Sequence, residues 1–164
     1  MMEKKIMIIG CPGSGKSTFA RKLRDMTNLP LYYLDMLFWN ADRTTVDKEV
    51  FQQRLEEILQ KDQWIIDGNY NRTIELRLQH CDMVFFLDYP TEVCMEGVRT
   101  RFGKEREDIP WVEKEVDEEF MEFIQNFQEN SKPKILALLE KYSDKKIITF
   151  HSRNEAEEYL RLCP

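Results

Sequence analysis

Residues 5–18 of the chain read KIMIIGCPGSGKST, an apolar run that passes directly into a glycine-rich turn. The turn matches the spacing G-x-x-x-x-G-K-[ST] from Gly10 to Ser17. After it, apolar side chains recur at helical spacing: Phe19, Ala20, Leu23 and Met26. A strand before the turn and a helix after it are the context that this phosphate-binding motif requires. Residues 5–26 therefore predict a strand, a phosphate-binding loop and a helix.

The chemistry of anion binding explains the spacing. Glycine takes backbone conformations that are barred to residues with a Cβ, so successive N–H groups can surround one anion. The helix that begins near Lys16 adds its free N–H groups and the positive end of its dipole. We expect Lys16 to reach the outer phosphates and the Ser17 hydroxyl to bind magnesium. The predicted phosphate-binding residues are Gly10, Cys11, Pro12, Gly13, Ser14, Gly15, Lys16, Ser17 and Thr18. The alternative is a glycine-rich turn with a solvated lysine.

Length and composition indicate one domain over residues 1–164. Hydrophobic residues make up 42% and charged residues 33%, which is typical of a soluble protein. No apolar run approaches the ~18 residues of a membrane span, and no secretory signal pattern is present, so we expect a cytoplasmic protein. The four cysteines form no C-x-x-C pair, which favours reduced thiols over a zinc site.

The net charge of −6 is concentrated in one segment. Residues 104–130 hold ten acidic and three basic side chains. No long basic stripe is present to neutralise a nucleic-acid backbone, so we do not expect a nucleic-acid partner.

Apolar runs alternate with amphipathic segments along the rest of the chain. Strands are predicted at residues 5–9, 31–34, 64–66, 83–87 and 146–150. Helical periodicity separates them, and residues 83–87 are apolar throughout, as in a strand buried on both faces. Residues 103–110 are predicted to form a mobile loop, and residues 112–129 a long acidic helix with a phenylalanine stripe. The pattern indicates an α/β fold with a parallel sheet covered on both sides.

Three acidic residues fall where predicted strands end. Asp35, Asp67 and Asp88 each follow an apolar run. Ligands of parallel α/β sheets bind beyond the carboxyl ends of the strands. These acids are therefore weighed above the others, although each can also serve a turn or a helix cap.

The phosphate-binding loop combined with residues 67–73, DGNYNRT, resembles the adenylate-kinase-like branch of P-loop kinases. The resemblance runs over nearly the whole chain. It implies a three-layer α/β/α P-loop NTPase fold, a five-stranded sheet of order 2-3-1-4-5 and a helical lid at about residues 99–130. It also implies ATP and Mg²⁺ as cofactors and a small-molecule phosphate acceptor.

Four stretches together are similar to the bacterial DNA topology modulation (FlaR-like) family: residues 6–10, 33–39, 64–70 and 131–136. That family name implies a regulatory effect on DNA. A nucleotide-binding regulator with weak or no transferase activity is therefore the alternative to a kinase, and a plain NTPase is a third possibility.

The resemblance assigns roles to further residues. Asp67 is expected to hold the metal through water. Asp35 is similar in position to the acid of shikimate kinase that engages the acceptor hydroxyl, and it replaces the threonine of adenylate kinases. Arg99 and Arg101 are predicted to close over the phosphates, with Arg106 as a further candidate; solvated surface charge is the alternative for each.

The remaining candidates concern the acceptor and the base. Arg72 and Arg77 are predicted to clamp the acceptor, although pairing with Glu75 competes. Phe38 is predicted to stack on an acceptor ring, with core packing as the alternative. Arg153 lies in the segment where the family holds adenine. The acceptor, the choice between ATP and GTP and the oligomeric state stay open.

Overall fold

The computed structural model describes residues 2–101, 103–104, 106–112 and 117–163. Its centre is a five-stranded sheet in which every neighbouring pair is parallel. The strand order is β2-β3-β1-β4-β5, which confirms the predicted order. The strands are β1 (Lys5–Gly10), β2 (Leu31–Tyr33), β3 (Trp64–Asp67), β4 (Met83–Leu87) and β5 (Lys146–Phe150).

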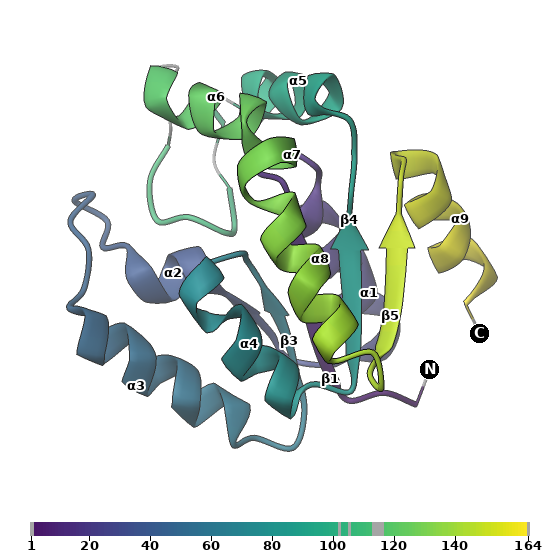
Figure 1. Ribbon diagram of the computed structural model, residues 1–164. Helices are drawn as coiled ribbons and strands as arrows, with labels where there is room; N and C mark the ends of the chain where they lie inside the picture. The colour runs from purple at the N-terminus through teal and green to yellow at the C-terminus, as the bar shows by residue number, and fades with distance from the viewer. Residues whose placement is uncertain (1, 102, 105, 113–116, 164) are drawn as a thin grey trace.

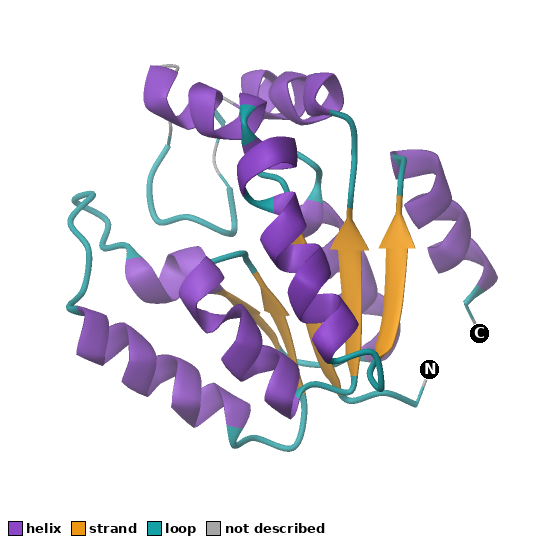
Figure 2. Ribbon diagram, in the orientation of Figure 1, coloured by secondary structure: helices purple, strands orange, loops and turns teal. Residues whose placement is uncertain are grey.

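Helices cover both faces of the sheet and make a three-layer α/β/α arrangement (Figures 1 and 2). The helices α1 and α9 contact each other on one face, whereas α3, α4 and α8 cover the other. The helices are α1 (Lys16–Thr27), α2 (Leu34–Phe38), α3 (Lys48–Leu59), α4 (Asn71–His80), α5 (Thr91–Arg101), α6 (Glu118–Gln125), α7 (Phe127–Asn130), α8 (Lys132–Lys141) and α9 (Arg153–Leu162).

The core lies on the central strands. Residues 6–9 of β1 are fully buried, and every residue of β4 is buried, as the uninterrupted apolar run predicts. Strand β5 is only partly buried because it forms an edge of the sheet. No helix in the described ranges is both long enough and apolar enough to cross a membrane.

Strand register brings the predicted acids to one edge. Asp67 at the end of β3 pairs with Ile8 of β1 on one side and with Tyr33 of β2 on the other. The strands all end at the edge where β1 runs into the phosphate-binding loop. The phosphate-binding loop and Asp67 therefore both lie at the carboxyl edge of the sheet, where ligands bind in this class of fold.

The lid differs from its prediction. The expected single helix over residues 112–129 is confirmed only in part: residues 118–125 form α6 and residues 127–130 the short α7, whereas Val112 and Asp117 are not helical. The start of α6 is fixed by Asp117, whose carboxylate accepts hydrogen bonds from the backbone N–H groups of Glu119 and Phe120. Residues 113–116 of that prediction lie outside the described residues. Figure 1 shows α5 and α6 beyond the arrowheads of the strands, over the carboxyl edge.

Candidate functional site

A cavity of about 900 Å³ opens at the carboxyl edge of the sheet, beneath the lid. Its lining includes the phosphate-binding loop, one side of α1, the residues that follow β2, β3 and β4, the lid and α9. Of the predicted phosphate-binding residues, Pro12 to Thr18 line the cavity. Gly10 and Cys11 precede this stretch and are not among the lining residues; Cys11 is buried.

The phosphate-binding loop has the backbone that its glycines predict. Gly13 and Gly15 have φ angles of 83° and 98°, in the left-handed region that favours glycine. Helix α1 begins directly after Gly15, so its free N–H groups point at the cavity end. The Asn69 side chain holds the start of the loop by bonding both the N–H and the C=O of Gly10, at 3.0 and 2.6 Å.

Helix α5 packs directly against this loop. A Cβ on Gly13 would lie 2.0 Å from the Cys94 carbonyl oxygen, and one on Gly97 would lie 2.0 Å from the Gly13 carbonyl oxygen. The Arg153 guanidinium donates a hydrogen bond to the same Gly13 carbonyl at 3.2 Å. Arg153 also lines the cavity, next to the loop. The loop is therefore fixed by close backbone packing and by a cation from α9.

A thiol of the loop, that of Cys11, lies close to the thiol of Cys94 on α5. Cys11 and Cys94 are both buried as free thiols. A hydrogen bond with Cys94, together with burial, raises the pKa of the Cys11 thiol far above its ordinary range. A protonated thiol is a small neutral filler, so Cys11 supports the loop and brings no charge to it.

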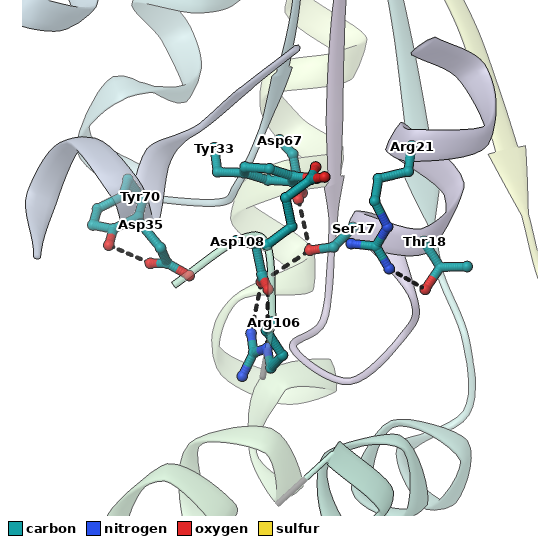
Figure 3. A network of polar contacts seen from close by, with 10 residues as sticks. Ser17, Thr18, Arg21, Tyr33, Asp35, Asp67, Tyr70, Arg106 and Asp108 are labelled. Carbon is teal, nitrogen blue, oxygen red and sulfur yellow. Dashed lines mark hydrogen bonds and ion pairs between the residues drawn. The ribbon is translucent and has the colours of Figure 1, made fainter. Parts of the chain in front are cut away.

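Ser17 stands between two carboxylates (Figure 3). Its Oγ lies 2.9 Å from Oδ2 of Asp67 and 3.0 Å from Oδ2 of Asp108. Burial raises the pKa of Asp67 to about 6, against the lowering effects of the nearby Lys16 charge and the Ser17 hydrogen bond. Ser17 and Asp67, predicted to serve one metal ion, are thus in contact.

Asp35 lies in the first turn of α2 and lines the same cavity. The Tyr70 hydroxyl donates a hydrogen bond to its Oδ1 at 2.5 Å. Burial raises the pKa of Asp35, while the Tyr70 hydrogen bond and the Lys16 charge act in the opposite direction. The structure therefore brings Asp35 into the cavity that Lys16 and Ser17 also line.

The lid loop folds back onto this site. The Arg106 guanidinium donates to both Asp108 oxygens, at 2.9 and 2.6 Å. The Glu107 carboxylate accepts hydrogen bonds from the Tyr33 hydroxyl and from Arg24, the latter at 2.9 Å. The lid loop is thus tied to the core at two consecutive carboxylates.

The predicted lid arginines separate into two groups. Arg101 lines the cavity, and its guanidinium lies 5.7 Å from the centre of the Phe120 ring. Arg106 also lines the cavity. The Arg99 side chain is 56% exposed, lies 3.9 Å from Glu96 and is not a lining residue. In this arrangement the Arg99 side chain is exposed and lies outside the cavity lining.

The predicted acceptor clamp needs correction. Arg77 is fully buried and donates to the backbone carbonyls of Gly68, at 2.8 Å, and Asn69. It therefore holds the turn after β3 and does not face the cavity. Arg72 is exposed and is not a lining residue. 

Phe38 and Asp88 also lie outside the cavity lining and contact other parts of the protein. Phe38 is not a lining residue; its ring packs against Phe51 and Tyr70, with centroids 5.5 and 5.2 Å away, which matches the core-packing alternative. Asp88 is buried and bonded to the Lys132 ammonium at 2.8 Å, outside the cavity lining.

Sequence reasoning gave no role to Tyr70, Asn69, Glu107 or Asp108. Asn69 and Tyr70 directly follow the Asp67-Gly68 pair, and their place at a strand end was an available signal. Glu107 and Asp108 belong to a segment rich in acids, where no local pattern distinguishes one carboxylate from another.

Comparisons with known proteins give sequence relatives of one kind. No family model matches the chain. It is 28% identical over 95 residues to an adenylate kinase of Thermotoga maritima, covering 56% of this chain and 42% of that protein. It is 29% identical over 121 residues to an adenylate kinase of Thermosipho africanus, covering 70% of this chain and 54% of that protein. The chain thus spans about half the length of these relatives.

Solved structures agree on the fold. A shikimate kinase from Bacteroides thetaiotaomicron superposes with a TM-score of 0.57 at 18% identity, over 97% of this chain and 95% of the other. A shikimate kinase from Acinetobacter baumannii in complex with shikimate gives 0.60 at 15% identity, over 98% and 93%. The resemblance to DNA topology modulation proteins stays a prediction. The chain therefore has the P-loop NTPase fold, and in sequence it is similar to adenylate kinases.

Proposed function

We propose that the protein transfers the γ-phosphate of ATP to a hydroxyl group of a small acceptor, with Mg²⁺ as cofactor. The observation that carries this proposal is the position of Asp35, which lines one cavity with Lys16 and Ser17. A carboxylate opposite a phosphate-binding loop is suited to accept a proton from an attacking hydroxyl. Similarity to adenylate kinases supports phosphoryl transfer.

The phosphate-binding loop supplies most of the charge that the reaction needs. Backbone N–H groups of the loop and of the first turn of α1 bind the β-phosphate, and Lys16 bridges the β- and γ-phosphates. Ser17 and Asp67 hold the metal, directly or through water. When bound, Mg²⁺ neutralises the charge that develops on the phosphate oxygens. The contact between Ser17 and Asp67 fits this role, because a magnesium ion that is bound together with a nucleotide needs only one or two protein carboxylates.

Asp35 serves the acceptor. The acceptor oxygen attacks the γ-phosphorus, the bond to the β-phosphate oxygen breaks, and the hydroxyl proton passes to Asp35. Burial raises the pKa of Asp35, which makes the carboxylate a stronger base than an exposed aspartate. Arg101 and Arg106, which line the cavity from the lid, add positive charge near the transferred group.

The charge of the lining does not select one class of acceptor. Beyond the phosphate-binding loop, the described lining carries carboxylates and cations in equal number: Asp35, Asp67, Glu107, Asp108 and Glu157 against Arg21, Lys22, Arg101, Arg106 and Arg153. Nucleotides, nucleosides and other small hydroxyl compounds are therefore all tested as acceptors.

The proposal is tested by incubating the protein with labelled ATP, Mg²⁺ and a panel of nucleosides, nucleoside monophosphates and small alcohols. We expect acceptor-dependent transfer that falls by roughly 100-fold or more in Asp35→Asn, since a positioned general base contributes about that much. Calorimetry should show that this variant still binds ADP. The matched control is Asp62→Asn, which removes an exposed carboxylate after α3.

Two results would count against the proposal. One is the lack of ATP or ADP binding by the wild-type protein with excess Mg²⁺. The other is acceptor-dependent transfer that is equal in Asp35→Asn and the wild type. ATP hydrolysis that no acceptor stimulates would support a plain NTPase.

A further inference from the structure

The hydroxyl of Ser17 has more acceptors around it than it can serve. Its Oγ lies 2.9 Å from a carboxylate oxygen of Asp67 and 3.0 Å from one of Asp108 (Figure 3). A serine hydroxyl carries one hydrogen and can donate it to one of the two. The other contact then has no proton between its two oxygens. Of these oxygens, Oδ2 of Asp108 also accepts a hydrogen bond from the Arg106 guanidinium at 2.6 Å, so the shortage of donors falls on Ser17 and Asp67.

The second carboxylate oxygen of Asp67 points to the same deficit. Asp67 is only 5% exposed, and its Oδ1 has no hydrogen-bond partner among the described residues. A buried charged oxygen without a partner is costly, and native structures satisfy such atoms with a donor, a water or an ion. This observation is independent of the Ser17 contacts.

We propose that Asp108 is a protein ligand of the divalent cation, so that Ser17, Asp67 and the lid loop form one metal site. The inference rests on the proposed function for the identity of the cation that uses the site. It adds a carboxylate from the lid to the loop hydroxyl and the acid at the end of β3. Two carboxylates and a hydroxyl, completed by phosphate oxygens and water, match the hard oxygen ligands that Mg²⁺ and Mn²⁺ select.

Neighbouring acids do not fit this role. Glu107 accepts hydrogen bonds from the Tyr33 hydroxyl and Arg24, whereas Asp108 contacts Ser17 of the phosphate-binding loop. Asp35 accepts the Tyr70 hydrogen bond instead of contacting Ser17. The part of the chain that the structure describes places no three His, Cys, Asp or Glu side chains together for a metal. The candidate site therefore depends on two acids and on ligands from the nucleotide.

Arg106 holds the Asp108 carboxylate in position. Its Nε donates to Oδ1 at 2.9 Å and its Nη2 donates to Oδ2 at 2.6 Å, which fixes the plane of the carboxylate; Oδ2 is also the oxygen that contacts Ser17 (Figure 3). A ligand held in this way is preorganised for the ion. Because Asp108 belongs to the lid loop and Ser17 to the phosphate-binding loop, a bound cation would join the two.

A rival explanation predicts the opposite effect of an Asp108 substitution on metal affinity. If Asp108 only fills the place that the metal or the γ-phosphate takes, it must leave before either binds. Removing its charge would then strengthen metal binding. If Asp108 is a ligand, removing its charge weakens metal binding. One substitution therefore separates the two explanations.

The test uses Mn²⁺ as the probe, with free Mn²⁺ followed by electron paramagnetic resonance, in the presence and absence of ADP. We expect Asp108→Asn to raise the Mn²⁺ dissociation constant about tenfold or more, since even changes to groups that orient a ligand cost about that much. Glu122→Gln is the matched control, because it removes an exposed carboxylate of the lid helix α6 outside the cavity lining, and it should stay within about twofold of the wild type. Unchanged or tighter Mn²⁺ binding in Asp108→Asn overturns the inference.

A second measurement uses the unmodified protein. Fe²⁺ with ascorbate and hydrogen peroxide cleaves backbone close to a bound metal, and we expect cuts near Ser17, Asp67 and Asp108. Cuts near the first two alone overturn the inference, as does a wild-type protein that binds no Mn²⁺ with or without ADP. Mn²⁺ binding without acceptor-dependent transfer would count against the proposed function and leave the metal site intact.

Discussion

The Tyr70 hydroxyl donates a hydrogen bond to the Asp35 carboxylate at 2.5 Å, from a backbone with a φ of 36°. A positive φ is uncommon for a bulky residue and persists where the surroundings enforce it. Here the Thr73 hydroxyl bonds the Tyr70 carbonyl at 2.9 Å, and the Tyr70 ring packs against Phe38 and Phe51. The strained turn thus directs one hydroxyl at the proposed base.

Replacing Tyr70 with Phe tests this relationship. The hydrogen bond lowers the pKa of Asp35, so its loss raises that pKa further above the ordinary value. A base must be deprotonated to act, and the acidic limb of the kcat/KM profile should therefore move to higher pH. At pH values on this acidic limb, the transfer rate of Tyr70→Phe should be roughly tenfold lower than that of the wild type, as for the loss of a hydrogen bond to a charged group.

The control for this prediction is Tyr32→Phe, which removes a hydroxyl on β2 outside the cavity lining. Its pH profile should match that of the wild type. A Tyr70→Phe profile with unchanged limbs and a uniformly lower rate would mean that the hydroxyl serves packing alone.

Arg77→Leu should destabilise the protein by about 3 kcal/mol or more. The substitution leaves the partly buried carbonyls of Gly68 and Asn69 without their donor, and unsatisfied groups cost about 1–3 kcal/mol each when buried. Chemical denaturation would measure the change in the free energy of unfolding. Arg72→Leu removes an exposed arginine from the same helix and should shift it by less than about 0.5 kcal/mol. Equal effects of the two substitutions would contradict a structural role for Arg77.

The fold was predictable because its signals are local. The G-x-x-x-x-G-K-[ST] spacing and the apolar runs each reside in a few consecutive residues, and resemblance supplied the strand order. The position of Asp35 and Asp67 at the carboxyl edge followed from the same rule about parallel sheets.

What the sequence did not predict depends on contacts between distant segments. From the sequence, Arg77 is predicted to bind the acceptor, because no local pattern shows that its guanidinium bonds two carbonyls of the preceding turn. Asp108 contacts Ser17, a residue 91 positions away, and the choice of Asp108 over Glu107 depends on how the lid loop folds. The lid helix was placed too early because periodicity does not register a cap such as Asp117.

Gly97→Ala should weaken nucleotide binding by pushing α5 away from the phosphate-binding loop. Its Cβ would lie 2.0 Å from the Gly13 carbonyl oxygen and 2.8 Å from the Arg153 guanidinium, so α5 and the phosphate-binding loop must separate. Overpacking of this kind costs about 1–3 kcal/mol. In an unhindered helix the same change would stabilise the protein by up to about 1 kcal/mol. A loss of stability in Gly97→Ala would therefore indicate the clash.

Two measurements check this prediction: the melting temperature and the ADP dissociation constant from calorimetry. Glu96→Ala is the control, because it alters an exposed side chain on the same helix. A stabilised Gly97→Ala variant with wild-type ADP affinity would show that the loop and α5 are not tightly coupled.

Asp67→Asn should stabilise the metal-free protein at alkaline pH. Burial raises the pKa of Asp67 from 3.8 to about 6 in the folded state, so folding takes up a proton between these values. The stability that this group contributes is complete below about pH 4 and is lost as the pH rises through about 6. A shift of about 2 pK units corresponds to about 3 kcal/mol, and Asn, which does not ionise, escapes this loss.

Thermal unfolding in a chelating buffer would measure the difference between Asp67→Asn and the wild type. The variant should melt several degrees higher at pH 8, at roughly 2–4 °C per kcal/mol, and the difference should shrink toward zero below about pH 4. Excess Mg²⁺ and ADP should reverse the order, because the wild type alone gains the binding energy of the metal. Asp62→Asn, which alters an exposed carboxylate, should show neither effect. A variant that is less stable than the wild type at pH 8 without metal would mean that the Ser17 hydrogen bond outweighs the burial of the Asp67 charge.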